Sequence, residues 1–447
     1  MPNLDAVVKA YDVRGTVPDQ LDESLARAFG VAFARYTGAT SVVVAHDMRP
    51  SGPGLVAAFE DGVTSCGVSV VNLGLASTDL LYYASGSMNL PGAMFTASHN
   101  PAQYNGIKLC KAGARSIGID SGLSEVRELA RAVLGTQIIG DRGKVTKRNL
   151  LADFADHVLS FVDVVELRPL KVVADTANGM GGLVVPAVFD RVSAVDLEVM
   201  YGELDGTFPN HPADPIQPAN QRDLQARVVA GGFDVGLAFD GDADRVFLVD
   251  ELGRTMSGST TTAILAKVFL RRTPGATILY NLISSRAVRE VIAESGGTGI
   301  RTQNGHSYMK GIMADTGAVF AGEHSGHYYF ADNYRADSGL IAALVVLEEM
   351  SRTGLPLSKL REPVERYASS GEINMQVNDI DAIIARVAEK YSMYPQDRLD
   401  GLTVDCGDWW FNVRSSNTEP LLRLNLEATT REQCDTHVAA LLQLITA

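Results

Sequence analysis

The stretch "FDVGLAFDGDADR", residues 233–245, decides the class of fold. An apolar run typical of a buried strand ends in a polar turn that contains glycine. The same succession recurs in "SVVVAHD" (41–47), "KVVADTANG" (171–179), "ATILYNL" (276–282) and "GAVFAGEHSGH" (317–327). Helical patterns lie between these runs, and strands that alternate with helices indicate doubly wound α/β layers. In such sheets, ligands bind beyond the carboxyl ends of the strands, where these polar turns fall.

Two of the helical patterns are well defined. In the first, apolar residues recur at every fourth position from Leu21 to Phe33, before Gly38. The second, "DSGLIAALVVLEEM" (337–350), predicts a buried helix with Asp337 as its N-cap.

The end of the chain predicts a smaller α+β domain. Leucines alternate with polar residues from Leu422 to Leu426, as in a half-buried strand. Thr429 and Glu432 have capping-box spacing at the start of a closing helix. The apolar stripe of that helix consists of Val438, Leu441, Leu442 and Ile445.

Length and composition set limits on the class of protein. A chain of 447 residues suggests about three domains, or four small ones, and turn-rich stretches place boundaries near residues 145, 253 and 367. Hydrophobic residues make up 46% of the chain and charged residues 21%, which is typical of globular proteins. The net charge of −14 argues against a general nucleic-acid or anionic-membrane surface. An anionic ligand therefore needs a local basic pocket.

Other features indicate a cytoplasmic protein. The four cysteines lie far apart without CxxC spacing, so neither a disulfide framework nor a zinc site is predicted. The strongest apolar run, "LIAALVVL" (340–347), is much shorter than a membrane span. The N-terminus lacks the basic and apolar regions of a signal peptide.

"DGDADR" (240–245) predicts a cation site. Asp240, Asp242 and Asp244 place three carboxylates close together, and Gly241 permits a tight turn. Such carboxylates repel one another unless a cation neutralises them, and oxygen ligands select Mg²⁺ or Ca²⁺. Mg²⁺ is the better choice for phosphate chemistry. The alternative is a solvated acidic turn.

A calcium-binding EF-hand loop is the second alternative for this segment. Counted from Asp240, the twelfth position is Glu251, as an EF-hand requires. However, Arg245 occupies the sixth position, where that loop needs glycine, and "VFLVDE" (246–251) is typical of a strand. We therefore favour the magnesium site.

"FTASHNP" (95–101) contains a candidate nucleophile, Ser98. On an extended segment Ser98 and His99 point to opposite sides, so the partners of Ser98 are expected from elsewhere in the chain. Lys108 follows in "YNGIKL", and no GxSxG motif supports a hydrolase triad. A serine, a divalent metal and a lysine suggest phosphoryl transfer. The alternative is a serine that merely caps a turn.

Two further loops predict ligand contacts. In "GEHSGH" (322–327) the alternating Glu323, Ser325 and His327 would face the same way on an extended segment and suit sugar hydroxyls, with His324 pointing away. "RSSNTEP" (414–420) combines a guanidinium with hydroxyls and exposed N–H groups, which suits a phosphate. Its proposed phosphate ligands are Arg414, Ser416, Asn417 and Thr418, with Glu419 pointing outward. Ordinary polar turns are the alternative for both loops.

Weaker signals complete the survey. "YDVRG" (11–15) and "GHSYMK" (305–310) supply Tyr11, Arg14, His306 and Lys310. "DTANGMGG" (175–182) resembles a glycine-rich phosphate loop but lacks the GxxxxGK[ST] pattern. Trp409 and Trp410 indicate domain packing.

Read in order, these loops resemble those of the α-D-phosphohexomutase superfamily, in its phosphomannomutase/phosphoglucomutase branch. The resemblance extends over almost the whole chain. It implies four domains around a central cleft, of which three share an α/β mixed-sheet core and the last is α+β. The implied domains are 1–145 with a phosphoserine loop, 146–253 with a metal loop, 254–367 with a sugar loop and 368–447 with a phosphate loop.

The resemblance also implies the role of each site residue. Ser98 matches the serine that is phosphorylated, and an oxygen of its phosphate joins Asp240, Asp242 and Asp244 as a ligand of Mg²⁺. Lys108 is the leading candidate for general acid/base. The residues expected around the transferring phosphoryl group are Arg14, His99, Lys108 and Arg245. The sugar ligands are Glu323, Ser325 and His327, the distal phosphate ligands are Arg414, Ser416, Asn417 and Thr418, and the rim contacts are Tyr11, His306 and Lys310.

The chain departs from the resemblance at "YNLISSR" (280–286). Ile283 stands about where many relatives have a lysine. The contact of that lysine is therefore missing, or it is supplied by Ser284, Ser285 or Arg286.

The implied activity interconverts mannose 1-phosphate and mannose 6-phosphate, and also glucose 1-phosphate and glucose 6-phosphate, through a hexose 1,6-bisphosphate. A mainly glucose-specific mutase, a metal-dependent sugar phosphatase and a non-catalytic sugar-phosphate sensor are the alternatives. The chain is expected to be a monomer or weak dimer without nucleic-acid or membrane partners.

Overall fold

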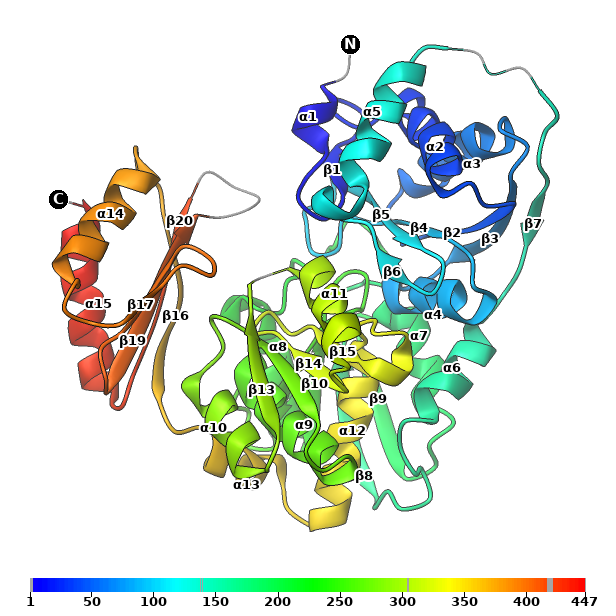
Figure 1. Cartoon of the computed structure of the whole chain (residues 1–447). Coiled ribbons are helices and arrows are strands. Elements are labelled where there is room, and N and C mark those ends of the chain that lie inside the picture. Colours follow the sequence, from blue (N-terminus) through cyan, green and yellow to red (C-terminus); the bar gives the residue numbers. More distant parts are fainter. Residues whose placement is uncertain (1–2, 137, 139, 304, 416–420, 447) are drawn as a thin grey trace.

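The computed structural model describes residues 3–136, 138, 140–303, 305–415 and 421–446. Four domains follow one another along the chain, each built on its own sheet (Figure 1). Three have α/β layers and the last is α+β, as expected. Within the described residues, the helices are too short or too polar to cross a membrane.

The first domain has a mixed sheet. Its strand order is β1-β5-β4-β2-β3-β7, with β6 paired to β5. β2 pairs parallel with β3 and β4, whereas β5 is antiparallel to β1 and β4. The strands are β1 (Val13–Thr16), β2 (Ser41–His46), β3 (Ser69–Leu75), β4 (Gly92–Phe95), β5 (Tyr104–Lys111), β6 (Arg115–Ser116) and β7 (Val145–Lys147). The helices are α1 (Leu4–Val7), α2 (Glu23–Thr37), α3 (Gly52–Thr64), α4 (Thr78–Met88) and α5 (Leu123–Val133).

The first predicted helix is α2. Asp22 caps its N-terminus and Gly38 ends it in the left-handed conformation, at φ +59°. Leu21 precedes the helix rather than belonging to it, and the apolar residues from Leu21 to Phe33 are fully buried.

The second and third domains repeat one arrangement. Their strand orders are β11-β10-β8-β9 and β13-β12-β14-β15, and in each a parallel part continues into an antiparallel hairpin. The second domain has β8 (Leu170–Asp175), β9 (Val195–Met200), β10 (Val235–Phe239), β11 (Val246–Asp250), α6 (Leu151–Leu159), α7 (Gly181–Phe189) and α8 (Arg222–Gly231). The third has β12 (Thr277–Asn281), β13 (Thr298–Thr302), β14 (Phe320–Gly322), β15 (Tyr328–Phe330), α9 (Gly258–Arg272), α10 (Arg286–Glu294), α11 (His306–Thr316), α12 (Gly339–Thr353) and α13 (Leu357–Arg361).

The predicted N-cap of the helix in 337–350 is wrong by one residue. Ser338 caps α12, because its hydroxyl accepts a hydrogen bond from the N–H of Ile341. The carboxylate of Asp337 instead faces Lys310 and His327. The helix itself is buried, as predicted.

The fourth domain is an antiparallel sheet with two helices. Its strand order is β16-β20-β19-β18-β17. In β20 the leucines from Leu422 to Leu426 are buried, as predicted, and the apolar stripe of α15 packs against this sheet. Thr430, not Thr429, accepts a hydrogen bond at the start of α15, from the N–H of Gln433. The elements are β16 (Ala368–Met375), β17 (Gln396–Asp397), β18 (Leu402–Asp405), β19 (Trp409–Ser415), β20 (Leu422–Ala428), α14 (Ile380–Lys390) and α15 (Arg431–Thr446).

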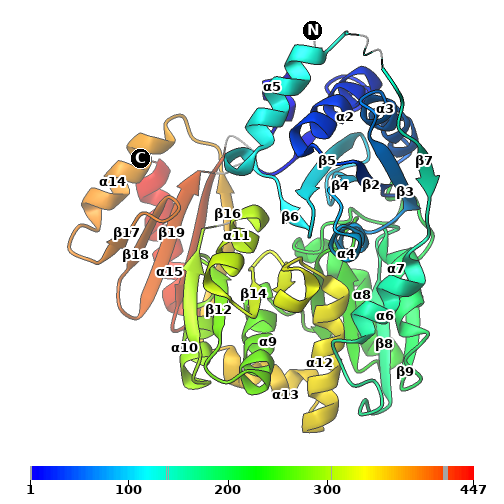
Figure 2. The ribbon, with the colours of Figure 1, turned by 45° about the vertical axis from the view of Figure 1, so that its right-hand side comes forward.

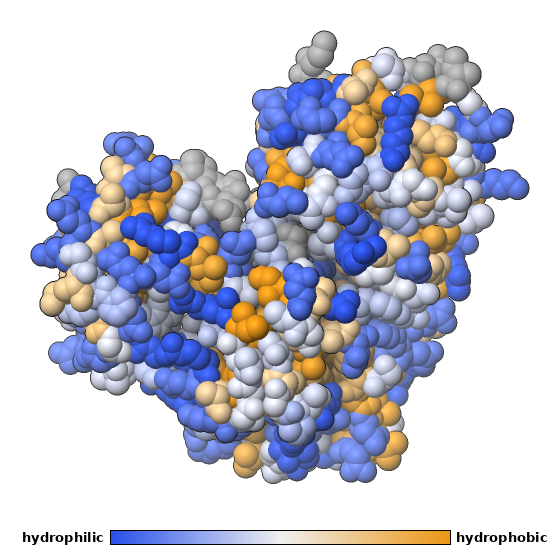
Figure 3. Space-filling view, in the orientation of Figure 1, coloured by the Kyte–Doolittle hydropathy of each residue, from blue (hydrophilic) through white to orange (hydrophobic). Residues whose placement is uncertain are grey.

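Apolar packing divides the chain into two parts. One buried cluster runs without interruption from the first domain through the second and third. The fourth domain has a cluster of its own between its sheet and its helices. In both ribbon views the fourth domain lies beside the third (Figures 1 and 2). The space-filling view shows the molecule hollowed between the fourth and first domains (Figure 3).

Candidate active site

The candidate site is built from loops that follow strands of different domains. Ser98 follows β4, Asp240 follows β10 and Glu323 follows β14, so each lies just beyond the carboxyl end of its strand. Arg414 lies near the end of β19 in the fourth domain. The position beyond strand ends is the one that an α/β sheet provides for ligands.

Ser98 contacts the acidic loop of the second domain. Its hydroxyl donates a hydrogen bond to Asp240 Oδ2 over 2.7 Å, and its side chain is almost completely buried. Ser98 has φ +49°, a left-handed conformation that is uncommon outside glycine. This turn also brings Ser98 Oγ to 3.2 Å from His99 Nδ1, so the expectation that the two side chains diverge on an extended segment is wrong.

The close approach of the two loops requires Gly241. A Cβ atom on Gly241 would lie 2.4 Å from the carbonyl oxygen of Ser98, which is shorter than any van der Waals contact. Behind the acidic loop, the N–H of Met180 donates to the Gly241 carbonyl oxygen over 2.8 Å. The glycine-rich segment 175–182 therefore packs against the acidic loop.

Arg49, which the sequence analysis missed, holds the Ser98 loop from behind. Its guanidinium donates hydrogen bonds to the carbonyl oxygens of Ser98, Asn100, Pro101 and Tyr104 over 2.6–2.9 Å. The side chain is fully buried and lies 3.2 Å from the carboxylate of Asp47. The only sequence signal for this role is the position of Arg49, two residues after the predicted strand 41–47, in "HDMRP".

Asp240, Asp242 and Asp244 fit a cation site. The ligand oxygens of the three carboxylates lie within 4.8 Å of one another, and all three residues are buried. Asp242 Oδ1 and Asp244 Oδ1 accept no hydrogen bond within the described part of the chain. Buried carboxylate oxygens without donors are suited to a hard divalent cation such as Mg²⁺.

Two cationic side chains pair with the carboxylates of the acidic loop. Lys108 Nζ lies 2.7 Å from Asp242 Oδ2 and 2.8 Å from Asp244 Oδ2. Arg245 Nε donates to Asp240 Oδ2 over 2.9 Å. Thr78, at the start of α4, donates its hydroxyl to Asp242 Oδ2 over 2.6 Å, and sequence reasoning missed this contact because Thr78 belongs to another domain.

The pKa values of the residues in this cluster shift in different directions. Burial raises the pKa of Asp240 to about 7, although Arg245 opposes the rise. Burial and the neighbouring Asp242 also raise the pKa of Asp244. Burial acts on Asp242 too, but Lys108 outweighs it and lowers the pKa of that carboxyl. The pKa of Lys108 is well above its usual value, because the two carboxylates outweigh its burial.

The calcium-loop alternative does not fit the structure. Glu251, the residue at its twelfth position, accepts hydrogen bonds from the hydroxyl and the N–H of Ser358. Residues 246–250 form β11, so the chain leads away from the cluster. The carboxylate of Glu251 is thus engaged in the contact with α13.

The predicted sugar loop is a tight turn and not an extended segment. It joins β14 to β15, with the N–H of Glu323 donating to the His327 carbonyl oxygen over 2.9 Å and Gly326 at φ +87°. Glu323 is buried and accepts a hydrogen bond from the Tyr329 hydroxyl over 2.6 Å. Ser325 Oγ lies 3.4 Å from the same carboxylate. His324 Nδ1 lies 3.2 Å from Ser259 Oγ, consistent with a structural role.

His327 connects the sugar loop to the acidic loop. Its Nδ1 lies 2.7 Å from Asp337 Oδ2 and 3.7 Å from Asp244 Oδ1. These carboxylates raise the pKa of His327 although burial acts in the opposite direction. Lys310, expected at the rim, is instead buried against Asp337, with its Nζ 2.9 Å from Asp337 Oδ1.

Arg14 lies beside the Ser98 loop. Its Nη1 donates to Asn100 Oδ1 over 2.6 Å, and its other end pairs with Asp12. Burial, assisted by Arg245 and Arg14, lowers the pKa of His99 well below its usual value. Tyr11 lies edge-on to Tyr308, with ring centroids 6.0 Å apart.

The phosphate loop is described only at its start. Arg414 is buried, and its Nη2 donates to Glu372 Oε2 over 2.7 Å. Ser416, Asn417, Thr418 and Glu419 lie outside the described residues, as does the side chain of His306.

The three residues considered as replacements for the lysine near Ile283 make other contacts. Ser284 Oγ donates to Asn281 Oδ1 over 2.5 Å, and Ser285 caps α10. Arg286 pairs with Asp405 of the fourth domain over 2.9 Å. Ile283 itself is buried.

Comparison with known proteins gives the class that this fold and site define. The four domain models of the phosphoglucomutase/phosphomannomutase family match the chain at residues 5–131 (domain I), 152–253 (domain II), 257–367 (domain III) and 372–444 (C-terminal domain). The chain belongs to this family, within the α-D-phosphohexomutase superfamily, and is a hexose phosphate mutase.

Individual relatives agree with the family assignment. The chain is 37% identical to a phosphomannomutase of Salmonella montevideo and 39% identical to phosphohexose mutases of Xanthomonas campestris, with 94% of each sequence covered. A solved structure of a phosphoglucomutase/phosphomannomutase family protein from Burkholderia thailandensis superposes with a TM-score of 0.89 at 30% identity. That match covers 100% of this chain and 98% of the other.

Proposed function

We propose that this chain is a phosphomannomutase that interconverts mannose 1-phosphate and mannose 6-phosphate, and that it also interconverts glucose 1-phosphate and glucose 6-phosphate. One contact carries the proposal: Ser98 Oγ lies 2.7 Å from Asp240 Oδ2, although the two residues belong to different domains. A serine hydroxyl against a buried triplet of carboxylates suits a phosphoserine held by a divalent cation.

The reaction runs through two phosphoryl transfers. In the first, the bond between phosphorus and Ser98 Oγ breaks and a bond to the free hydroxyl at C1 or C6 of the hexose phosphate forms. That hydroxyl loses a proton, and Ser98 Oγ gains one. The resulting hexose 1,6-bisphosphate turns round in the cleft, and its other phosphoryl group returns to Ser98. Because the intermediate turns, the single loop that begins at Arg414 serves for whichever phosphate is not reacting.

We propose a separate role for each group of site residues. Asp240, Asp242 and Asp244, with an oxygen of phospho-Ser98, would hold Mg²⁺, which when bound offsets the negative charge of the phosphoryl group. Lys108 is proposed as general acid/base; its two carboxylate partners keep it protonated, so it would act first as an acid. Arg14, Arg245 and His99 surround the phosphoryl group. The proposed substrate contacts are Tyr11, His306, Glu323, Ser325, His327, Arg414, Ser416, Asn417 and Thr418.

The position of the sugar contacts supports acceptance of both sugars. Glucose and mannose differ only at C2, whereas Glu323 and Ser325 are proposed to bind O3 and O4. Both hydroxyls are equatorial in the two sugars, so these contacts do not discriminate. Comparison of kcat/KM for mannose 1-phosphate and glucose 1-phosphate in one preparation determines the preference.

The decisive experiment uses the purified full chain with Mg²⁺ and a trace of glucose 1,6-bisphosphate. Phosphorus NMR should show conversion of mannose 1-phosphate to mannose 6-phosphate, and mass spectrometry should find phosphate on Ser98. Ser98→Ala should lose both, whereas Ser87→Ala, which alters an exposed serine of α4, should lose neither. Stoichiometric release of inorganic phosphate would identify a phosphatase instead, and binding without conversion a sensor.

The cellular setting is part of the proposal. We expect a cytoplasmic monomer or weak dimer without nucleic-acid or membrane partners. Sedimentation analysis of the purified chain tests the oligomeric state.

A further inference from the structure

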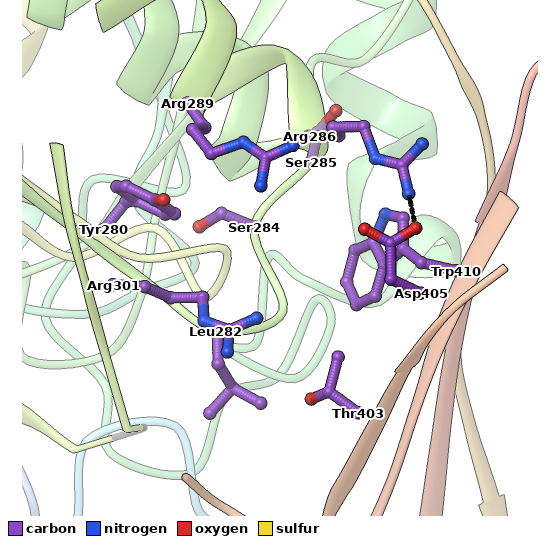
Figure 4. A pocket seen from close by; sticks show the side chains of 10 residues that line it. All are labelled: Tyr280, Leu282, Ser284, Ser285, Arg286, Arg289, Arg301, Thr403, Asp405 and Trp410. Atoms are coloured by element: carbon purple, nitrogen blue, oxygen red, sulfur yellow. Dashed lines mark hydrogen bonds and ion pairs between the residues drawn. The ribbon is translucent and has the colours of Figure 1, made fainter. Parts of the chain in front are cut away.

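A small cavity lies between the third and fourth domains, apart from the acidic loop and the sugar loop. Its volume is about 60 Å³. Residues at the carboxyl end of β12, on β13 and at the start of α10 form one wall, and residues of β18 and β19 form the other (Figure 4). A cavity of this size has room for a phosphate group.

The wall of the cavity is rich in positive charge. Arg286, Arg289 and Arg301 line it, whereas Asp405 is the only carboxylate among the lining residues. In Figure 4 the guanidinium groups of Arg289 and Arg301 approach Ser284 from opposite sides. Burial raises the pKa of Tyr280, and the charges of Arg289 and Arg301 both oppose this rise. Such a cluster stands out in a chain with a net charge of −14.

Pairing within the chain leaves part of this charge uncompensated. Arg286 pairs with Asp405, and Arg301 pairs with Asp397. For Arg289 the described part of the chain provides no acidic partner, although its side chain faces the cavity. A guanidinium has five N–H donors, so the paired arginines also keep donors for a ligand.

One neutral donor completes the cavity. Thr403 is 6% exposed, and its hydroxyl oxygen accepts a hydrogen bond from Asn412 Nδ2 over 3.0 Å. Its own hydroxyl hydrogen has no acceptor within the described residues and can donate into the cavity. At the start of α10 the N–H of Arg286 already donates to Glu427 Oε2 over 2.9 Å, so this helix end is paired with a carboxylate.

We propose that this cavity binds a phosphate-sized oxyanion, either inorganic phosphate or the phosphate group of a small ester. The bound anion would accept hydrogen bonds from Arg289 and Arg301 of the third domain and from Thr403 of the fourth. It would therefore join the two domains across their interface. The proposal does not depend on the reaction at Ser98, because no residue of the acidic loop lines this cavity.

Trp410 provides a probe for this cavity. Its ring lines the wall, and the only other tryptophan, Trp409, stacks on His437 in the fourth domain. In the full chain with Trp409→Phe, the fluorescence of Trp410 should saturate on titration with inorganic phosphate. A parallel titration with glycerol phosphate compares the ester with the free ion, and the ratio of the two Kd values identifies the better ligand.

Substitution of Arg289 tests whether phosphate binds in this cavity. Loss of a charge-assisted hydrogen bond predicts a Kd at least about tenfold higher for Arg289→Ala, and a greater loss for Arg289→Glu. Neither variant should unfold the chain, because the side chain is exposed and unpaired in the described structure. The control Arg222→Ala removes an exposed arginine of α8 that does not line the cavity and should leave the Kd unchanged.

Two results would overturn the proposal. The first is the absence of any phosphate-dependent change in Trp410 fluorescence. The second is an equal response in the parent and in Arg289→Ala, since that would assign the signal to phosphate bound elsewhere, near Ser98 or at Arg414.

Discussion

The ammonium group of Lys310 lies 2.9 Å from Asp337 Oδ1 and 3.5 Å from the ring centroid of Tyr82. The other oxygen of Asp337 lies 2.7 Å from His327 Nδ1. Lys310 therefore fixes the orientation of Asp337, and Asp337 fixes the imidazole that faces the acidic loop. We therefore expect Lys310 to act as a positioning residue through Asp337.

Replacement of Lys310 by methionine should affect both stability and turnover. The buried carboxylate of Asp337 loses its cation, so urea denaturation should show a free energy of unfolding lower by about 3 kcal/mol. Because His327 is no longer held, kcat should fall more than KM rises. Lys359→Met, which removes an exposed pair with Glu362, should cost less than about 1 kcal/mol. A wild-type kcat in Lys310→Met would contradict the positioning role.

Gly241→Ala should separate the acidic loop from Ser98. The added Cβ would lie 2.4 Å from the Ser98 carbonyl oxygen, so one loop has to move. A displacement of about 1 Å predicts a roughly 100-fold lower kcat. Gly311→Ala is the matched control, because its Cβ would meet no atom and alanine is favoured in a helix. Steady-state kinetics on both variants checks this, and equal rates would argue against the close contact.

Arg49→Met should disorganise the Ser98 loop. Four carbonyl oxygens lose their donor and Asp47 is left buried without its cation, which should lower the free energy of unfolding by about 3–5 kcal/mol. Phosphate incorporation at Ser98 should fall in the fraction that stays folded. Arg131→Met, on the exposed face of α5, should show no measurable change in a denaturant titration.

Magnesium affinity should rise with pH. Burial raises the pKa of Asp240 to about 7, and a cation must displace that proton. Calorimetry should therefore find binding about tenfold tighter at pH 8 than at pH 6, with release of protons.

Without Mg²⁺ the folded chain holds this proton to higher pH than the unfolded chain does. This group thus lowers the free energy of unfolding as pH rises from about 4 to about 7. Asp240→Asn should bind Mg²⁺ weakly and without this pH dependence.

The sequence predicted the local features well. Apolar runs followed by polar turns identified strands and the loops beyond them, because burial and turn chemistry depend on neighbouring residues. The acidic spacing in 240–245 identified the buried carboxylate cluster for the same reason. The order of these loops then identified the family.

Contacts between distant segments were not predictable in this way. Arg49 and Thr78 act through tertiary packing, and no local pattern distinguishes them from ordinary residues. Asp337 has the spacing of an N-cap, but Ser338 caps the helix. The carboxylate of Asp337 instead pairs with Lys310 and His327. The left-handed turn at Ser98 and the hairpin turn at 323–327 replaced the extended segments assumed in the sequence analysis.

The apolar core that unites the first three domains does not extend into the fourth. The sheet of the fourth domain packs against helices of its own. Ion pairs such as Arg286–Asp405 connect the fourth domain to its neighbour. Surfaces held by partly exposed ion pairs can separate and re-form in water at a lower cost in free energy than apolar surfaces can. Rotation of the last domain would therefore need little free energy, as the proposed reorientation of a bisphosphate beneath Arg414 requires.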